Sequence, residues 1–105
     1  MLYDGALRFT RDAKEAIAKG DIRKRSEAIS RALAIIGELQ STLDMNAGGD
    51  IAQSLDQLYS FVRDRLLDAS FRQDARPLEE ALTVLTSLRG AWSDISAQQT
   101  GPAAT

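Results

Sequence analysis

The fold class of this chain is decided by ISRALAIIGEL, residues 29–39, in which apolar side chains recur every three or four positions. This spacing matches the 3.6-residue period of an α-helix and places those side chains on one face. The segment extends back to Asp21, a favourable N-cap that follows Gly20, and forward to about Leu43. We therefore predict a helix whose inner face consists of Ile22, Ile29, Ala32, Leu33, Ile36 and Leu39.

One further helix is predicted before this segment in the chain, and one after it. The first runs from the start of the chain to about Lys19, with a face formed by Leu2, Ala6, Phe9, Ala13, Ala16 and Ile17. In the loop 44–50, Gly48 and Gly49 break the helical pattern, and Asp50 is a good N-cap for a helix from Ile51 to about Arg72. The stripe of that helix is Ile51, Leu55, Leu58, Tyr59, Val62, Leu66 and Ala69.

A fourth helix is predicted after the linker 73–76. Pro77 suits a first helical turn, and the two acidic residues that follow it are favoured there by the helix dipole. The helix runs to about Ser96, and its inward-facing residues are Leu78, Ala81, Leu82, Leu85, Leu88 and Trp92. Residues 97–105 carry only small or polar side chains with Gly101-Pro102, so we expect a disordered tail.

Four amphipathic helices joined by short loops, with no strand pattern, predict an all-α fold. The expected architecture is an antiparallel up-down four-helix bundle over residues 1–96. The first helix is shorter than the second and third helices by a turn or more, so it should leave one end of the bundle core uncovered. It also begins without a capping residue, because the helical pattern is already present at Met1.

Composition narrows the function classes. The chain has 105 residues, 44% of them apolar and 27% charged, which is typical of one globular domain. The net charge of −2 disfavours nucleic acid as a partner, and there is no membrane-length apolar run or signal-peptide pattern. Cysteine and histidine are absent, which removes the thiol nucleophile, the commonest general base and the commonest transition-metal ligands. We expect a cytoplasmic protein that is not an enzyme and that needs no metal or cofactor.

Three local patterns suggest chemistry, and each has a simpler interpretation. The loop from Asp44 resembles the start of a calcium loop, but Leu55 stands where an EF-hand needs its acidic ligand. We interpret the carboxylates of Asp64 and Asp68, with Arg65 between them, as a solvated helix face. The basic run 23–25 lacks interleaved aromatic residues, so we also interpret it as solvated helix surface.

Several apolar residues fall outside the predicted stripes: Leu7, Ile35, Phe61, Leu67, Phe71 and Val84. Scattered apolar residues are normal on a protein surface. For Leu7 and Val84, this explanation is as good as a role in partner binding. Three large side chains off the stripe of one helix, at 61, 67 and 71, instead suggest grooves that receive the amphipathic helices of a partner. We predict the whole set as candidate partner-binding residues. A helical bundle that self-associates through the same residues is the alternative.

A family resemblance rests on an ordered set of short motifs between Met1 and about Ile95. These are Leu2-Tyr3-Asp4-Gly5-Ala6-Leu7, Gly20-Asp21, Ile29-Ser30-Arg31-Ala32, Ile35-Ile36-x-Glu38-Leu39, Leu43-Asp44-Met45, Gly48-Gly49-Asp50-Ile51-Ala52, Leu55-x-x-Leu58-Tyr59, Arg65-Leu66 and Leu88-Arg89-x-Ala91-Trp92. In this order and spacing, the chain resembles the flagellar secretion chaperone family FliS. It departs from the family at Ala69-Ser70-Phe71 and at Ala75-Arg76, which delays the proline of the last helix.

The resemblance implies a cytoplasmic, non-enzymatic chaperone. Members of the family bind the disordered C-terminal segment of flagellin, block premature filament assembly and help deliver flagellin to the export apparatus. Met1 aligns with a methionine inside the first helix of the family, so we expect this chain to lack a cap segment and the first turns of that helix. Restoring those residues is then expected to raise the melting temperature.

Overall fold

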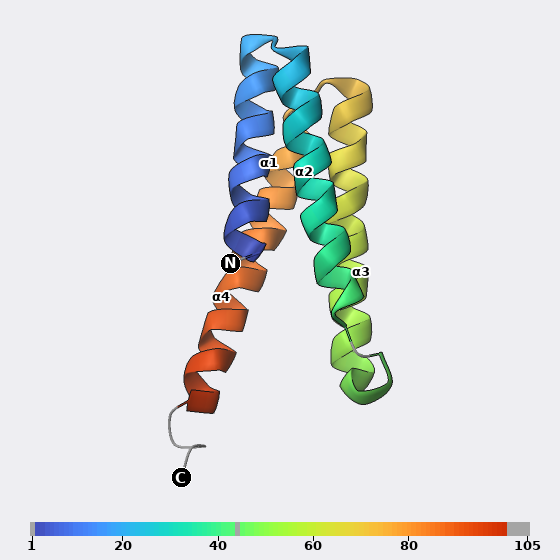
Figure 1. The fold of residues 1–105 in the computed structure, drawn as a ribbon, viewed down its shortest axis with the longest axis vertical. Helices are drawn as coiled ribbons and strands as arrows, with labels where there is room; N and C mark the ends of the chain where they lie inside the picture. The colour runs from blue at the N-terminus through green and yellow to red at the C-terminus, as the bar shows by residue number, and fades with distance from the viewer. Residues whose placement is uncertain (1, 44, 101–105) are drawn as a thin grey trace.

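The computed structural model describes the backbone of residues 2–43 and 45–100, and the side chains of residues 2–43 and 49–90. In this range the chain forms four helices, α1 (Leu2–Lys19), α2 (Ile22–Ser41), α3 (Met45–Arg72) and α4 (Arg76–Thr100), and no strand. Each helix packs against its neighbour in the chain, and α4 also packs against α1, which closes the ring. Consecutive helices run in opposite directions (Figure 1). The predicted all-α antiparallel four-helix bundle is confirmed.

The turn between α1 and α2 forms as its residues predict. Gly20 adopts the left-handed conformation with φ of 71°, which costs glycine little because it has no Cβ. The Asp21 amide then donates to the Ala16 carbonyl oxygen over 2.8 Å. Asp21 is the N-cap of α2, and its carboxylate accepts a hydrogen bond of 3.1 Å from the Lys24 amide. The stop and start signals at residues 20 and 21 are therefore confirmed.

The boundary between α2 and α3 differs slightly from the prediction. The helix α2 ends at Ser41 with Thr42 as its C-cap, shortly before the expected end near Leu43. Helical residues resume at Met45, but Gly49 interrupts them with φ of 54° and ψ of −130°. Gly49 thus breaks the helix as expected, although residues 45–48 of the predicted loop are helical, and the long uninterrupted part of α3 follows Gly49.

The turn between α3 and α4 depends on Gln73 and Asp74. Gln73 adopts φ of 54°, and its amide donates to the Ala69 carbonyl oxygen over 2.9 Å, which ends α3. The Asp74 carboxylate accepts from the backbone amide of Arg76 (3.0 Å) and pairs with the Arg76 guanidinium (2.9 Å). The side-chain hydrogen bond from Arg76 lowers the pKa of Asp74. Pro77 lies in the first turn of α4, as predicted.

The last helix is longer than expected. It ends at Thr100 instead of about Ser96, so it includes the first four residues of the predicted tail. Residues 101–105 and the side chain of Trp92 lie outside the described residues, and the predictions made for them stay predictions. The helix α1, with 18 residues, is the shortest of the four, and α4 continues past its beginning (Figure 1).

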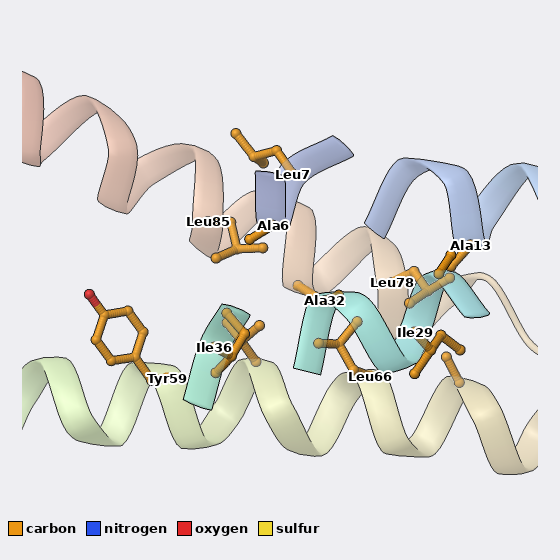
Figure 2. Close-up of a cluster of buried hydrophobic side chains, with 14 of the residues drawn as sticks. Ala6, Leu7, Ala13, Ile29, Ala32, Ile36, Tyr59, Leu66, Leu78 and Leu85 are labelled. Atoms are coloured by element: carbon orange, nitrogen blue, oxygen red, sulfur yellow. The ribbon is translucent and has the colours of Figure 1, made fainter. Parts of the chain in front are cut away.

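The core contains most of the predicted stripe residues. Its fully buried large side chains include Ile36, Val62, Leu66, Leu78 and Leu85, which come from α2, α3 and α4. Small residues of α1 pack against them, and Figure 2 shows Ala6 and Ala13 on the far side of the cluster from α3. Alanine and glycine let α1 approach α2 closely, since a Cβ at Gly5 would lie 3.0 Å from the Ile35 Cδ1 atom.

Several predicted faces are wrong at particular residues. Leu7 is only 2% exposed, and it lies in the core beside Leu85 and Ala6 (Figure 2). The reason is that α1 packs against both α2 and α4, so its buried face is wider than one stripe. Conversely, Leu58 of the predicted inner stripe is 38% exposed, and Ile22 and Ile51 are 59% and 73% exposed. Each isoleucine lies at the beginning of its helix, Ile22 as the first residue of α2 and Ile51 just after the break at Gly49.

A test of helix energetics follows from Gly37, an exposed glycine within α2. A Cβ added at this position would meet no atom within 4 Å. We expect Gly37→Ala to raise the free energy of unfolding by about 0.5–1 kcal/mol, because alanine loses less backbone entropy in a helix. Urea unfolding followed by circular dichroism measures this change. Gly20→Ala is the control with the opposite expected sign, since its φ of 71° disfavours any Cβ.

Candidate partner-binding surface

Large apolar side chains remain exposed on α3, outside the core. Phe61 is 42% exposed, Leu67 37% and Phe71 87%. All three were predicted from the sequence as off-stripe residues, and the structure confirms their exposure. Because α3 packs against α2 on one side and α4 on the other, the position of each residue around the helix decides which neighbouring helix it lies beside.

One group, the α4-side patch, consists of Ile51, Leu58 and Phe61. Arg65 marks this side of α3, because its guanidinium pairs with the Glu80 carboxylate of α4 over 3.3 Å. Phe61, Leu58 and Ile51 lie about one, two and four turns before Arg65, and therefore on the same side. The Arg65 guanidinium also stands 5.8 Å from the centre of the Phe61 ring. The exposed patch thus lies on the side of α3 that faces α4 near Arg65, whereas the beginning of α3 and the end of α4 diverge (Figure 1).

The second group, the α2-side patch, consists of Ile22, Leu67 and Phe71. Gln40 of α2 marks this seam, because its amide donates to Asp56 Oδ1 (3.1 Å) and Ser60 Oγ (3.2 Å) of α3. Leu67 lies about three turns after Asp56, and Phe71 about three turns after Ser60. Ile22 lies about five turns before Gln40 and so shares its side of α2. The exposed side chains of this patch line the outside of the seam between α2 and α3.

The other three candidate residues have different surroundings. Leu7 is buried in the core and is not available as a contact. Ile35 was expected outside the inner stripe of its helix, but it is half-buried, packs on the core and faces Gly5 of α1. Val84 of α4, predicted to fall outside the stripe of its helix, is also half-buried and packs against the core. The candidate set is therefore divided, and only Phe61, Leu67 and Phe71 form part of the exposed patches.

Charged residues around the α4-side patch form a network that the sequence pattern did not show. Asp68 pairs with both Arg65 (3.4 Å) and Arg72 (3.1 Å), and its side chain is only 22% exposed. Since Arg65 also pairs with Glu80, the network joins α3 to α4. The interpretation of residues 64–68 as a simple solvated face is therefore incomplete, because Arg65 pairs across the seam with Glu80 and Asp68 pairs with Arg65.

The helix α1 is attached to the rest of the bundle by polar contacts at its beginning and further along. The Tyr3 and Tyr59 hydroxyl groups are hydrogen-bonded to each other across the bundle, with ring centres 6.4 Å apart. Asp4 pairs with Arg89 of α4 over 2.8 Å, and Lys14 pairs with Glu79 over 3.4 Å. Tyr59 is buried, whereas its partner Tyr3 is half-buried. These contacts fix the position of α1 against α3 and α4.

The Tyr59 phenol makes stability sensitive to alkaline pH. Burial, together with the hydrogen bond to Tyr3, raises the pKa of Tyr59 above its ordinary value of about 10. The unfolded chain therefore loses this proton at a lower pH than the folded chain. The free energy of unfolding should fall as pH rises above about 10. In the Tyr59→Phe variant this free energy should fall less steeply with pH. Urea unfolding at a series of pH values measures both slopes, and equal slopes would contradict the assignment.

A hollow of about 360 Å³ lies between α1 and α2. Its floor contains Phe9, whose ring faces the Arg31 and Arg8 guanidinium groups at 5.6 and 5.8 Å. Acidic and basic side chains alternate around it, so it is less apolar than the two patches. Within the described residues, no group of three or more acidic side chains is placed to hold a metal ion. Nor is any helix in that range long and apolar enough to cross a membrane.

Comparison with known proteins gives a consistent result. The family model described as "Flagellar protein FliS" matches residues 1–99. The flagellar secretion chaperone FliS of Salmonella typhimurium is 39% identical over 97 residues, which cover 91% of this chain and 72% of that protein. The protein of the same name from Vibrio cholerae is 36% identical over 95 residues, or 90% of this chain and 70% of that protein. The Campylobacter jejuni protein is 36% identical over 100 residues, covering 95% and 78%.

Proposed function

This chain belongs to the FliS family, and from that premise we propose that it is a cytosolic flagellar export chaperone for flagellin. In this proposal it binds the disordered C-terminal segment of flagellin, prevents its premature polymerisation and assists its delivery to the export apparatus. Its relatives are named flagellar secretion chaperones. The further statement, that flagellin is the cargo, is our proposal for this chain.

The observation that carries the proposal is the pair of exposed apolar patches on the two sides of α3. Each patch follows a seam between two helices, which is the geometry that accepts the apolar face of an amphipathic helix. A disordered segment that folds onto both seams would bury its apolar side chains over a large area. It would lose conformational entropy in doing so, and this cost lowers the affinity per unit of buried area.

Calorimetric titration with a flagellin C-terminal segment tests this function. We expect saturable binding with a negative heat-capacity change, because apolar surface is buried. Helicity of the mixture should exceed the sum of the separate components by circular dichroism. An absence of binding at tens of micromolar, with the chain shown to be folded, would contradict the proposal.

Sedimentation of the chain alone separates the proposal from self-association. A monomer leaves both patches free for a partner. A tight dimer that loses flagellin binding as it forms would support the alternative, a helical module that associates with itself through the same side chains.

A further inference from the structure

We infer that the cavity beside Arg25 receives a single carboxylate group from the polypeptide that the protein binds. The cavity lies at the end of the bundle that contains both the α1–α2 turn and the α3–α4 turn. The inference rests on the proposed binding of a polypeptide and adds a charged contact to it. From the sequence, residues 23–25 were expected to be solvated helix surface, but Arg25 is only 8% exposed.

The buried guanidinium of Arg25 has unused hydrogen-bonding capacity. No acceptor lies within hydrogen-bonding distance of its buried Nε atom, and no ion pair between described side chains includes it. The acidic residue that lines the cavity, Asp21, is the N-cap of α2 and accepts from the Lys24 amide. A buried hydrogen-bond donor without an acceptor is costly, so a ligand that supplies an acceptor to Nε gains free energy at this position.

The helix ends around the cavity favour the positive charge of Arg25 without hydrogen-bonding its Nε. The cavity is lined by Ala16 and Ile17 of the last turns of α1 and by Gln73, which directly follows α3, and the negative ends of helix dipoles attract cations. The carbonyl oxygens of Ala16, Ile17 and Ala69, however, accept from backbone amides of the two turns, at 2.8, 3.1 and 2.9 Å. These carbonyl oxygens are therefore not acceptors for Nε, and because their potential opposes an anion, a carboxylate must bind through direct hydrogen bonds to the guanidinium.

The size and lining of the cavity indicate the kind of ligand. Its volume is about 120 Å³, well below the roughly 300 Å³ of the smallest typical small-molecule sites. One carboxylate group with its methylene stem is a better match, and a guanidinium binds a carboxylate through two parallel hydrogen bonds. Ile17 and Ile22 provide apolar walls for that stem. Ile22 also belongs to the α2-side patch, so a polypeptide on that patch reaches the cavity.

Nuclear magnetic resonance of the full chain tests the site without any flagellar protein. The probe is N-acetylglutamate amide, with N-acetylglutamine amide as the matched neutral control. We expect a saturable shift of the Arg25 Nε–H signal with the glutamate probe and at least a tenfold weaker response to the glutamine probe. An equal response to both probes, to sodium chloride at matched ionic strength, or to neither would overturn the inference. A stronger response to inorganic phosphate would also overturn it, since the ligand would then not be a carboxylate.

Binding of the flagellin C-terminal segment provides the second test. Arg25→Met should weaken this binding about tenfold, whereas Arg23→Met, which removes an exposed charge from the same turn, should change it by less than about twofold. Equal effects of the two variants would overturn the inference while the proposed function stands. If the wild-type chain does not bind the segment, the proposed function fails, and the glutamate titration still decides whether Arg25 binds a carboxylate.

Discussion

Leu66→Ala is expected to lower the free energy of unfolding by about 2–5 kcal/mol, because truncating a buried leucine removes apolar contacts and leaves a cavity. Leu66 is fully buried in α3 and lies in the cluster that joins α2, α3 and α4 (Figure 2). Domains of this size are stable by only about 5–15 kcal/mol, so the loss is a large fraction of the total. Urea unfolding, with the melting temperature as a second measurement, tests the expectation.

Phe71→Ala is the matched control on the same helix. Phenylalanine is the larger side chain, but Phe71 is 87% exposed, so its truncation should change the free energy of unfolding by less than about 0.5 kcal/mol. The comparison separates burial from residue type. A cost for Phe71→Ala similar to that of Leu66→Ala would show that Phe71 is packed in solution, and the α2-side patch would lose its most exposed member.

Helix boundaries and most of the core could be predicted from the sequence because their signals are local. Gly20 and Asp21 end one helix and begin the next through their own backbone conformation and side chain. Gly49 breaks α3 for the same kind of reason. The three- and four-residue spacing of apolar side chains then indicates which face of α2 is buried, and Ile29, Ala32, Ile36 and Leu39 are indeed buried.

The residues that the sequence did not predict correctly depend on contacts between distant segments. Leu7 is buried because α4 closes the ring against α1, which no periodicity within α1 shows. Arg25 belongs to a basic run that looks solvated, and its burial arises only where α1, α2 and the α3–α4 turn meet. The hydrogen bond between Tyr3 and Tyr59 joins residues far apart in the chain.

The same limitation applies to the candidate surface. Phe61, Leu67 and Phe71 were correctly predicted as exposed from their positions outside the stripe. The buried residues of α3 lie on another side of the helix. Ile22 and Ile51 follow the core spacing but are exposed at the beginnings of their helices. Periodicity cannot show where a neighbouring helix ends. The two patches are therefore more extensive than the sequence suggested, and they lie on two different seams.

Phe61→Ala and Leu67→Ala are each expected to weaken binding of the flagellin C-terminal segment by about tenfold or more. Aromatic and large aliphatic anchors in apolar seams contribute a large share of the binding energy at interfaces. The two residues lie on opposite seams of α3, too far around the helix to share one contact. If a partner occupies both seams, the affinity of the double variant should fall by about the product of the two single effects, or roughly a hundredfold.

Calorimetry on the two single variants and the double variant measures these effects, with circular dichroism to show that each remains folded. Arg11→Ala, which truncates an exposed side chain of similar size on α1, is the control and should leave the affinity within about twofold. Affinity unchanged in both single variants would show that neither seam binds flagellin. A loss confined to one variant would instead assign the partner to one seam, the α3–α4 seam for Phe61 or the α2–α3 seam for Leu67.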